Sequence, residues 1–314
     1  MSYSFELLTL LGPTASGKTA LAIALADRLN AELISADSRQ VYRGMNLGTG
    51  KDLEEYMRPD GTLRPHHLID ICSPGDPFSL YTYVKLCREA IQTIQRLDKL
   101  PLVVGGTGLY IETLLSGRTL SEVAPNEALR SELEYLSRAD LLEILNRYPR
   151  RPGVDLSTNR RIIRAIEVAT FRKQNSTSAT TDPAPPNACI LGLNIERSLL
   201  VERIKARLKN RLQRGLVAEV RSLLSIGIPP QTLIGYGLEY KYVTLYLQGE
   251  LTYERMQEQL FIAIRQFAKR QMTWFRGMER RGYTIRWIDG ADSLQKQTEQ
   301  ALTFIRSTAP GNNH

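Results

Sequence analysis

One octapeptide near the N-terminus constrains the fold more than any other stretch of this chain. The apolar run 7–11 precedes it, and Leu21, Leu25 and Leu29 follow it at four-residue spacing, so the pattern predicts a strand, a glycine loop and a helix. The octapeptide fits G-x-x-x-x-G-K-[ST] at every fixed position. It reads Gly12-Pro13-Thr14-Ala15-Ser16-Gly17-Lys18-Thr19.

A loop of this kind is suited to binding a polyphosphate. Gly12 and Gly17 let the backbone curl so that N–H groups and the helix N-terminus point at the anion. Lys18 is expected on the outer phosphate oxygens, and Thr19 is expected to offer its hydroxyl to Mg²⁺. The alternative is a glycine turn before an ordinary helix, and the flanking strand and helix favour phosphate binding over it.

Length and charge narrow the class of protein. The 314 residues, 42% hydrophobic and 24% charged, suffice for one α/β domain and an appendage. Residues 1–6 do not form a signal peptide, and no apolar run approaches the roughly 18 residues of a membrane helix, so we expect a cytoplasmic protein. The net charge is +8, and its basic residues gather in segments 147–173, 197–221 and 265–286, where a large anion could be held.

An acidic residue follows the second predicted strand, residues 31–36. Asp37 begins the run Asp37-Ser38-Arg39-Gln40. Because ligands of parallel sheets gather beyond the carboxyl ends of the strands, we expect Asp37 to face the glycine loop. Its carboxylate could hold Mg²⁺ through water or accept a proton, and capping the next helix is the structural alternative.

The buried-type strand 101–104 ends in Gly105-Gly106-Thr107. Many nucleoside-triphosphate hydrolases carry a metal-binding Asp at such a strand end, and its absence here weakens an ATPase interpretation. Thr107 remains as a candidate polar contact on the same sheet edge. Its hydroxyl could equally satisfy the local backbone of a turn.

The chain changes character between residues 119 and 188, where strand signals are sparse and arginines frequent. We therefore predict a P-loop core of the α/β class, a parallel sheet flanked by helices, formed by residues 1–118 and 189–314, with a helical insertion at 119–188. The insertion should end in a flexible, low-complexity linker. Its predicted helices are 125–137, 139–148 and 157–173, with the linker at 174–187.

Two later segments admit two interpretations each. The predicted helix 197–226 carries an arginine row, Arg203, Arg207 and Arg211, that is either a solvated face or a phosphate site. In segment 267–276, basic residues alternate with aromatic residues, as in a protein surface that binds single-stranded nucleic acid. The aromatic residues of that segment, Phe267 and Trp274, could instead belong to the core.

Two shorter features carry weaker expectations. The glycine-rich segment 44–50 is expected to be a mobile loop beside the active site. The pair His66 and His67 lies in a predicted strand, 66–71, and lacks a third ligand at metal spacing. We therefore expect these histidines to be structural or to contact substrate.

Taken together, the motifs resemble the tRNA dimethylallyltransferase (isopentenyltransferase) family. The resemblance implies transfer of a dimethylallyl group from dimethylallyl diphosphate to the exocyclic N6 amine of the adenosine 3′-adjacent to the anticodon. Segment 234–249 departs from the common bacterial pattern. The matching pieces are GPTASGKT at 12–19, LISADSRQVYRGMNLGTGK at 33–51, PLVVGGTGLY at 101–110, RRIIRAIEV at 160–168, ERIKARL at 202–208, GLVAEV at 215–220 and FAKRQMTWFR at 267–276.

The resemblance also implies roles for individual residues. It assigns the diphosphate and Mg²⁺ to the glycine loop with Lys18 and Thr19, proton removal to Asp37, and a donor-diphosphate contact to Arg207. The implied partner is the anticodon stem-loop of tRNA, bound by a monomer without a membrane. The implied tRNA contacts are Asp37, Ser38, Arg39, Gln40, Thr107, Arg130, Arg160, Arg161 and Arg164.

Three other functions remain to be weighed. A small-molecule kinase would share the glycine loop but would leave the basic insertion and the stretch KRQMTWFR without a task. An adenylate isopentenyltransferase would perform the same chemistry on a free nucleotide and would not need three arginine-rich segments. A non-catalytic RNA-binding protein would leave Lys18, Thr19 and Asp37 unused.

Overall fold

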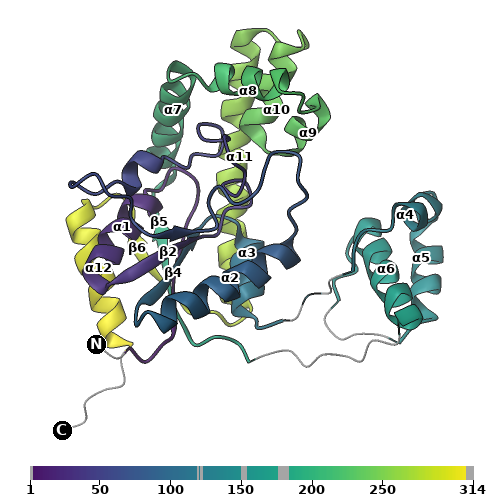
Figure 1. Ribbon diagram of the computed structural model, residues 1–314, viewed down its shortest axis with the longest axis horizontal. Helices are drawn as coiled ribbons and strands as arrows, with labels where there is room; N and C mark the ends of the chain where they lie inside the picture. Colours follow the sequence, from purple (N-terminus) through teal and green to yellow (C-terminus); the bar gives the residue numbers. More distant parts are fainter. Residues whose placement is uncertain (1–2, 119, 121–122, 150–153, 176–183, 309–314) are drawn as a thin grey trace. The chain divides into compact units, whose positions relative to one another are not determined.

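The computed structural model describes residues 3–118, 120, 123–149, 154–175 and 184–308. The chain divides into two compact units, which we call the core unit (Met1–Gly117 with Pro185–His314) and the helical unit (Arg118–Ala184). Residues 176–183 of the predicted linker lie outside the described part of the chain. Figure 1 shows the sheet in the core unit and the three short helices of the helical unit.

The core unit is built on a parallel sheet of six strands in the order β3-β2-β4-β1-β5-β6. The phosphate-loop strand β1 lies in the interior, with Leu8 opposite Leu102 on one side and Cys189 on the other. The α/β fold predicted from the sequence is thereby confirmed. The strands are β1 (Leu7–Leu11), β2 (Ala31–Ser35), β3 (His66–His67), β4 (Leu100–Gly105), β5 (Ala188–Asn194) and β6 (Ile285–Asp289).

Helices cover both faces of the sheet, because successive side chains of a strand point to opposite sides. Leu8 and Leu10 of β1 pack into the cluster formed with α1 (Lys18–Leu29) and α12 (Leu294–Ser307). On the other face lie α2 (Leu80–Arg96) and α3 (Gly108–Leu115). The side chain of Ser79 caps α2 by accepting the N–H of Thr82 at 3.1 Å.

A second apolar cluster joins the chain after β5 to the segment that follows β2. Val41, Tyr42 and Met45 pack in it among five helices, drawn in green at the top of Figure 1. This helical layer adjoins the segment that continues from the carboxyl end of β2, so it borders the edge where ligands of such sheets gather. Its members are α7 (Arg197–Gln213), α8 (Leu216–Ser225), α9 (Pro230–Gly235), α10 (Leu238–Leu247) and α11 (Tyr253–Arg280).

Two predicted elements are shorter than expected. The helix predicted for 197–226 is interrupted at Gly215, whose φ of 103° is left-handed and ends α7 before α8 begins. The strand predicted for 66–71 ends after His67, because Leu68 and Asp70 have φ values of 62° and 55° and cannot continue an extended strand. In both cases the apolar pattern crosses a backbone break.

The helical unit has a small core of its own. The described helices of this unit are α4 (Glu127–Leu133), α5 (Arg138–Asn146) and α6 (Asn159–Asn175). The buried members of the helical core are Leu133, Leu141, Ile162 and Ile166.

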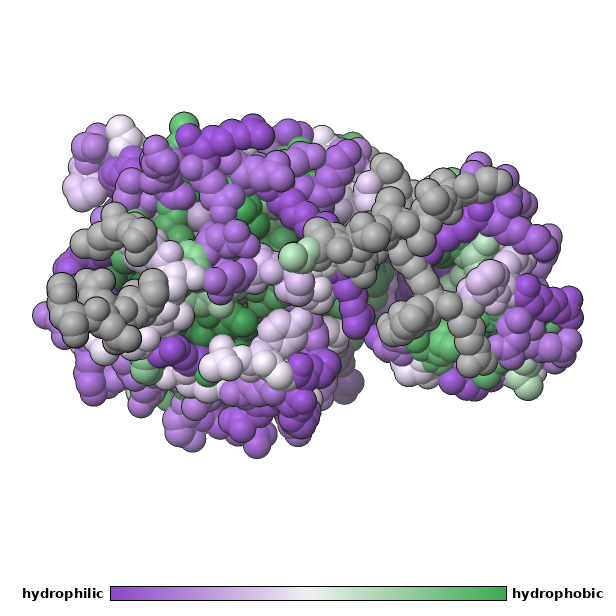
Figure 2. All heavy atoms as spheres, turned by 90° about the horizontal axis from the view of Figure 1, so that it is seen from below, coloured by the Kyte–Doolittle hydropathy of each residue, from purple (hydrophilic) through white to green (hydrophobic). Residues whose placement is uncertain are grey.

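Hydrophilic residues cover most of the face drawn in Figure 2. No helix in the described part of the chain is long and apolar enough to cross a membrane.

Candidate active site

The glycine loop turns sharply between β1 and α1. Ala15 and Gly17 have φ values of 62° and 94°, so the chain is left-handed at two positions of the loop. A Cβ on Gly12 would lie 3.1 Å from Ser16 Oγ. That hydroxyl is buried and has no hydrogen-bond partner among the described residues. A buried, unpartnered donor inside the loop fits an anion ligand.

Lys18 is the most perturbed cation of the loop. Its Nζ donates to the carbonyl oxygen of Pro13 at 2.7 Å. Burial and, second, the charge of Arg207 lower the pKa of Lys18 to about 7, while the Asp37 carboxylate acts in the opposite direction. Lys18, Arg207 and Asp37 therefore belong to one electrostatic site, assembled from α1, α7 and the end of β2.

The arginine row of α7 lies against this loop, so its face is not simply a solvated one. Arg203 Nη1 lies 3.4 Å from the carbonyl oxygen of Ser16, and Arg207 Nη1 lies 3.3 Å from Thr14 Oγ1. Arg211, one turn further, is only 6% exposed. The structure thus brings three guanidinium groups from one helix face to the phosphate loop and the segment beside it.

Asp37 lies at the carboxyl end of β2, as predicted. Its Oδ1 accepts the N–H of Arg39 at 2.8 Å, and the chain continues as a turn, so Asp37 caps no helix. Within the described residues its Oδ2 has no hydrogen-bond partner. The carboxylate is half-buried and keeps one oxygen available for a proton or a ligand.

The residues after Asp37 are tied to two neighbouring segments. Thr107 Oγ1 accepts the N–H of Ser38 at 3.2 Å, which joins the ends of β2 and β4. Gln40 accepts from Ser35 Oγ at 2.8 Å and donates to the carbonyl oxygen of Gly50 at 3.2 Å. The Arg39 guanidinium lies 5.9 Å from the ring centroid of Tyr236. Thr107 and Gln40 thus hold the Asp37 turn in place.

Gln271 of α11 is a site residue that the sequence analysis missed. Its Oε1 accepts the N–H of Thr14 at 2.8 Å, and its Nε2 donates to the carbonyl oxygen of Gly106 at 2.9 Å. A Cβ on Gly106 would lie 2.3 Å from that Nε2. The sequence analysis assigned a role to the basic and aromatic residues of KRQMTWFR. The buried glutamine between them, however, is the residue that joins α11 to the phosphate loop.

The aromatic residues of the same segment divide between surface and interior. Phe267 is 39% exposed, with the Arg270 guanidinium 5.9 Å from its ring centroid. Trp274 packs against Gly108 so closely that a Cβ there would lie 2.3 Å from Trp274 Cδ1. Trp274 therefore contributes to packing behind β4, and Phe267 remains on the surface with the bases.

Segment 44–50, which the sequence predicted to be a mobile loop, is hydrogen-bonded along its backbone to a side chain of α8. Glu219 of α8 accepts the N–H groups of Asn46, Leu47 and Gly48 at 2.9, 2.7 and 3.0 Å. Tyr240 of α10 donates its hydroxyl to the same carboxylate at 2.8 Å. A carboxylate that accepts four hydrogen bonds fixes this segment.

The two histidines have structural partners, as expected. His67 Nε2 lies 2.9 Å from Glu32 Oε2, and Lys99 Nζ lies 2.7 Å from Glu32 Oε1. His66 Nδ1 lies 2.9 Å from the carbonyl oxygen of Arg64. Within the described ranges no cluster of three or more His, Cys, Asp or Glu side chains could hold a metal ion.

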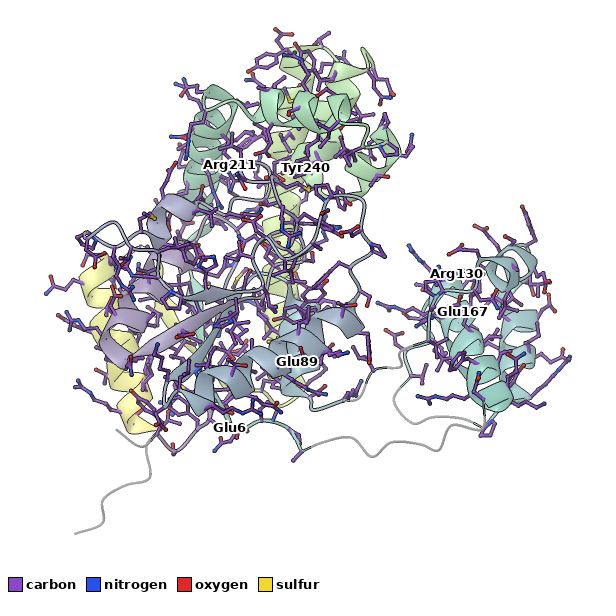
Figure 3. The ribbon with its side chains drawn as sticks, in the orientation of Figure 1. Glu6, Glu89, Arg130, Glu167, Arg211 and Tyr240 are labelled. Carbon is purple, nitrogen blue, oxygen red and sulfur yellow. The ribbon has the colours of Figure 1, made fainter. Side chains whose placement is uncertain are left out.

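In the helical unit the predicted arginines are engaged by a single buried carboxylate. Glu167, 2% exposed, accepts Arg130 Nε at 2.8 Å, Arg164 Nη1 at 3.0 Å and the N–H of Asn126 at 2.8 Å. Burial acts to raise the pKa of Glu167, but these hydrogen bonds outweigh it and hold that pKa below its ordinary value. Figure 3 shows Arg130 and Glu167 side by side.

The other two arginines of the helical unit differ from each other. Arg161 Nη1 lies 2.5 Å from both Asp155 Oδ2 and Ser157 Oγ. Arg160 is exposed and has no ion-pair or hydrogen-bond partner within the described residues. Among the four predicted contacts of this unit, Arg160 is therefore the one whose guanidinium is not already engaged.

Family models match most of the chain. The IPP transferase model matches residues 40–278, and the isopentenyl transferase model matches residues 5–65. The chain is 50% identical over 286 residues to a protein named tRNA dimethylallyltransferase 1 from Azobacteroides pseudotrichonymphae, covering 91% of this chain and 93% of that protein. It is also 50% identical over 305 residues to the protein of the same name from Parabacteroides distasonis, covering 97% and 99%.

A solved structure extends the likeness to the fold. The chain aligns with the full-length tRNA isopentenylpyrophosphate transferase from Bacillus halodurans with a TM-score of 0.71 and 34% identity. The alignment covers 96% of each chain. The similarity therefore includes the core and is not confined to the phosphate loop.

Proposed function

The chain belongs to the tRNA dimethylallyltransferase (IPP transferase) family, and we propose that it transfers a dimethylallyl group from dimethylallyl diphosphate to the N6 amine of the adenosine 3′-adjacent to the anticodon. In this reaction the N6–carbon bond forms, the bond from the allylic carbon to the diphosphate oxygen breaks, and N6 loses a proton. The observation that carries the proposal is geometric: Lys18 and Arg207 are both held on the glycine loop, and Asp37 lies at the same edge of the sheet, at the carboxyl end of β2.

The donor end of the site consists of the glycine loop and α7. We assign the diphosphate to the loop amides and the residues Lys18 and Arg207. Negative charge grows on the leaving oxygen as the allylic carbon departs, and fixed cations stabilise that charge without having to reorganise. Lys18, held by Pro13, and Arg207, held beside Thr14, are in place before the reaction.

The residues present fit a magnesium ion supplied with the diphosphate. Mg²⁺ is commonly held by substrate phosphates, water and one or two protein oxygens. Thr19 lies in the first turn of α1 with a half-buried side chain, and its hydroxyl would be the protein ligand. When bound, the ion would neutralise charge on the leaving diphosphate.

Asp37 is our candidate for the general base. The exocyclic amine of adenine is a weak nucleophile, because its lone pair is delocalised into the ring. A carboxylate within hydrogen-bond reach would accept the N6 proton as the new bond forms. Oδ2 of Asp37 is available for this, while Oδ1 is held by the N–H of Arg39.

The acceptor is RNA, and its target base must leave the anticodon stack to reach Asp37. We assign contacts near the base to the Asp37–Gln40 turn and Thr107. The helical unit would contact the RNA backbone through Arg160, with Arg130, Arg161 and Arg164 nearby in the same unit.

The test is transfer of labelled dimethylallyl groups from the diphosphate donor in the presence of Mg²⁺. Unmodified tRNA, the same tRNA already carrying a modified adenosine, and AMP are offered in separate reactions. Label on unmodified tRNA alone is expected. Label on AMP would support the free-nucleotide enzyme, and γ-phosphate transfer from ATP to a small acceptor would support a kinase.

A further inference from the structure

Arg211 and Asp52 form a second layer behind the donor arginine. Asp52 Oδ2 lies 2.8 Å from Arg207 Nη2 and 3.9 Å from Arg211 Nη2. Arg211 Nη1 is held by Glu239 Oε1 of α10 at 3.2 Å. One carboxylate therefore lies between two guanidinium groups: it is within hydrogen-bond distance of Arg207 and at the longer distance of a loose ion pair from Arg211.

Arg211 is poorly satisfied for a buried cation. It is 6% exposed, and its Nε and Nη2 have no hydrogen-bond partner among the described residues. An unpaired donor on a buried charge is costly and needs an explanation. Figure 3 shows Arg211 where α7 meets the neighbouring helices, with Tyr240 of α10 close by.

The Asp52 side chain is held by arginines rather than by the helix that it precedes. Gly50 is so tightly packed that a Cβ there would lie 1.7 Å from Arg211 Nη2 and 2.4 Å from Arg207 Nη2. Asp52 occupies the N-cap position of the short helix Leu53–Tyr56 but makes no side-chain cap bond. Among the described residues, the partners of its carboxylate are Arg207 and Arg211.

We propose that Asp52 is an exchangeable counterion: it neutralises Arg207 in the free enzyme and moves into hydrogen-bond distance of Arg211 Nη2 when the donor diphosphate binds Arg207. Arg211 is then a positioning residue, which receives the displaced carboxylate, and Glu239 anchors it. The segment 234–249, which departs from the family pattern, supplies that anchor. This inference rests on the proposed function in one respect, that Arg207 binds a diphosphate.

The experiment measures binding of inorganic pyrophosphate with Mg²⁺ by calorimetry, without tRNA or turnover. Asp52→Asn removes the competing charge from Arg207, so pyrophosphate should bind roughly twofold to fivefold more tightly than to wild type, the range expected for losing one partly exposed ion pair. Arg211→Met should weaken binding by a similar factor, because the displaced carboxylate then has no partner.

The double variant Asp52→Asn with Arg211→Met separates exchange from simple structural damage. With no carboxylate to displace, Arg211 should no longer matter, and the double variant should bind as tightly as Asp52→Asn alone. Arg214→Met is the matched control and should leave binding unchanged. Arg214, at the C-terminal end of α7, pairs with Glu54 at 2.6 Å. Thermal unfolding checks that each variant is folded, and Asp52→Asn alone decides the sign if Arg211→Met unfolds.

Each result bears on the exchange. If Asp52→Asn bound pyrophosphate more weakly than wild type, Asp52 would serve to orient Arg207, and the exchange would be overturned. The exchange would also be overturned if Arg211→Met weakened pyrophosphate binding equally in the wild-type and the Asp52→Asn backgrounds. If wild type fails to bind pyrophosphate, the diphosphate assignment fails as well. If wild type binds pyrophosphate but Asp52→Asn lowers the affinity instead of raising it, only the exchange is rejected.

Discussion

The core unit and the helical unit each carry a row of arginines, and the two rows differ in their counterions. On α7, Arg203 lies against a backbone carbonyl of the phosphate loop, and Arg207 pairs with Asp52, whose side chain is 23% exposed. On α6 and α4, Arg164 and Arg130 share the buried carboxylate of Glu167. Similar sequence patterns therefore give an incompletely neutralised site in one unit and a cross-linked helix pair in the other.

This difference shows that arginine spacing alone does not identify an anion site. What matters is how firmly a carboxylate of the same chain holds the guanidinium groups: the Glu167 side chain is fully buried between two arginines, whereas Asp52 is partly exposed. Glu167 lies three residues after Arg164, within the matching motif 160–168, and it neutralises both Arg164 and Arg130. We therefore expect substitutions in the core unit to affect chemistry, and those in the helical unit to affect stability and RNA affinity.

The largest expected effect is that of Asp37→Asn. The amide can still accept the N–H of Arg39 but cannot take a proton, so transfer should fall by about two decades or more, the usual contribution of a general base. tRNA affinity, measured by filter binding, should change little. Single-turnover transfer at the wild-type rate would remove Asp37 from the mechanism and erase this contrast between the units.

The next effect concerns pH. The pKa of Lys18 is lowered to about 7 by burial and Arg207, so the free enzyme loses this charge as the pH rises above that value. Since a bound anion favours the ammonium form, pyrophosphate binding should take up a proton and weaken by roughly tenfold per pH unit above neutrality. Lys18→Arg, which stays charged, is the control and should remove that part of the dependence in calorimetry.

The sequence predicted more of the fold than of the hydrogen bonds that hold the site together. The glycine loop, Asp37 and the parallel sheet follow from local patterns, because turn chemistry and apolar periodicity are written within short windows. Gln271 contacts Thr14 across 257 positions, and Glu219 reaches Leu47 across 172. Such bonds depend on how helices pack over the sheet edge, and no short pattern contains them.

Glu167→Gln tests the cross-linked row directly. Loss of a buried carboxylate that holds two arginines should destabilise the helical unit by about 1–3 kcal/mol, because both guanidinium groups are partly exposed and can return to water. Hydrogen exchange should accelerate in α4 and α6 and remain unchanged in β1 and α7. Glu143→Gln, whose exposed carboxylate pairs with Arg147, is the control.

If Glu167→Gln left exchange in α4 and α6 unchanged, the pairing would be energetically unimportant. The two rows would then differ less than their geometry indicates. An increase of exchange throughout the core unit as well would show that the helical unit does not unfold by itself.

The smallest expected effect is that of Arg160→Ala, the helical-unit arginine that has no partner within the described residues. Removing one guanidinium that binds a phosphate should lower the slope of log K against log salt by about one and weaken tRNA binding a few-fold at physiological salt. Arg147→Ala provides the comparison, since Arg147 already pairs with Glu143 at 2.9 Å. Equal slopes for wild type and Arg160→Ala would mean that even the least neutralised arginine of this unit does not reach the RNA. The unit would then act on tRNA through something other than charge, and the contrast between the rows would concern folding alone.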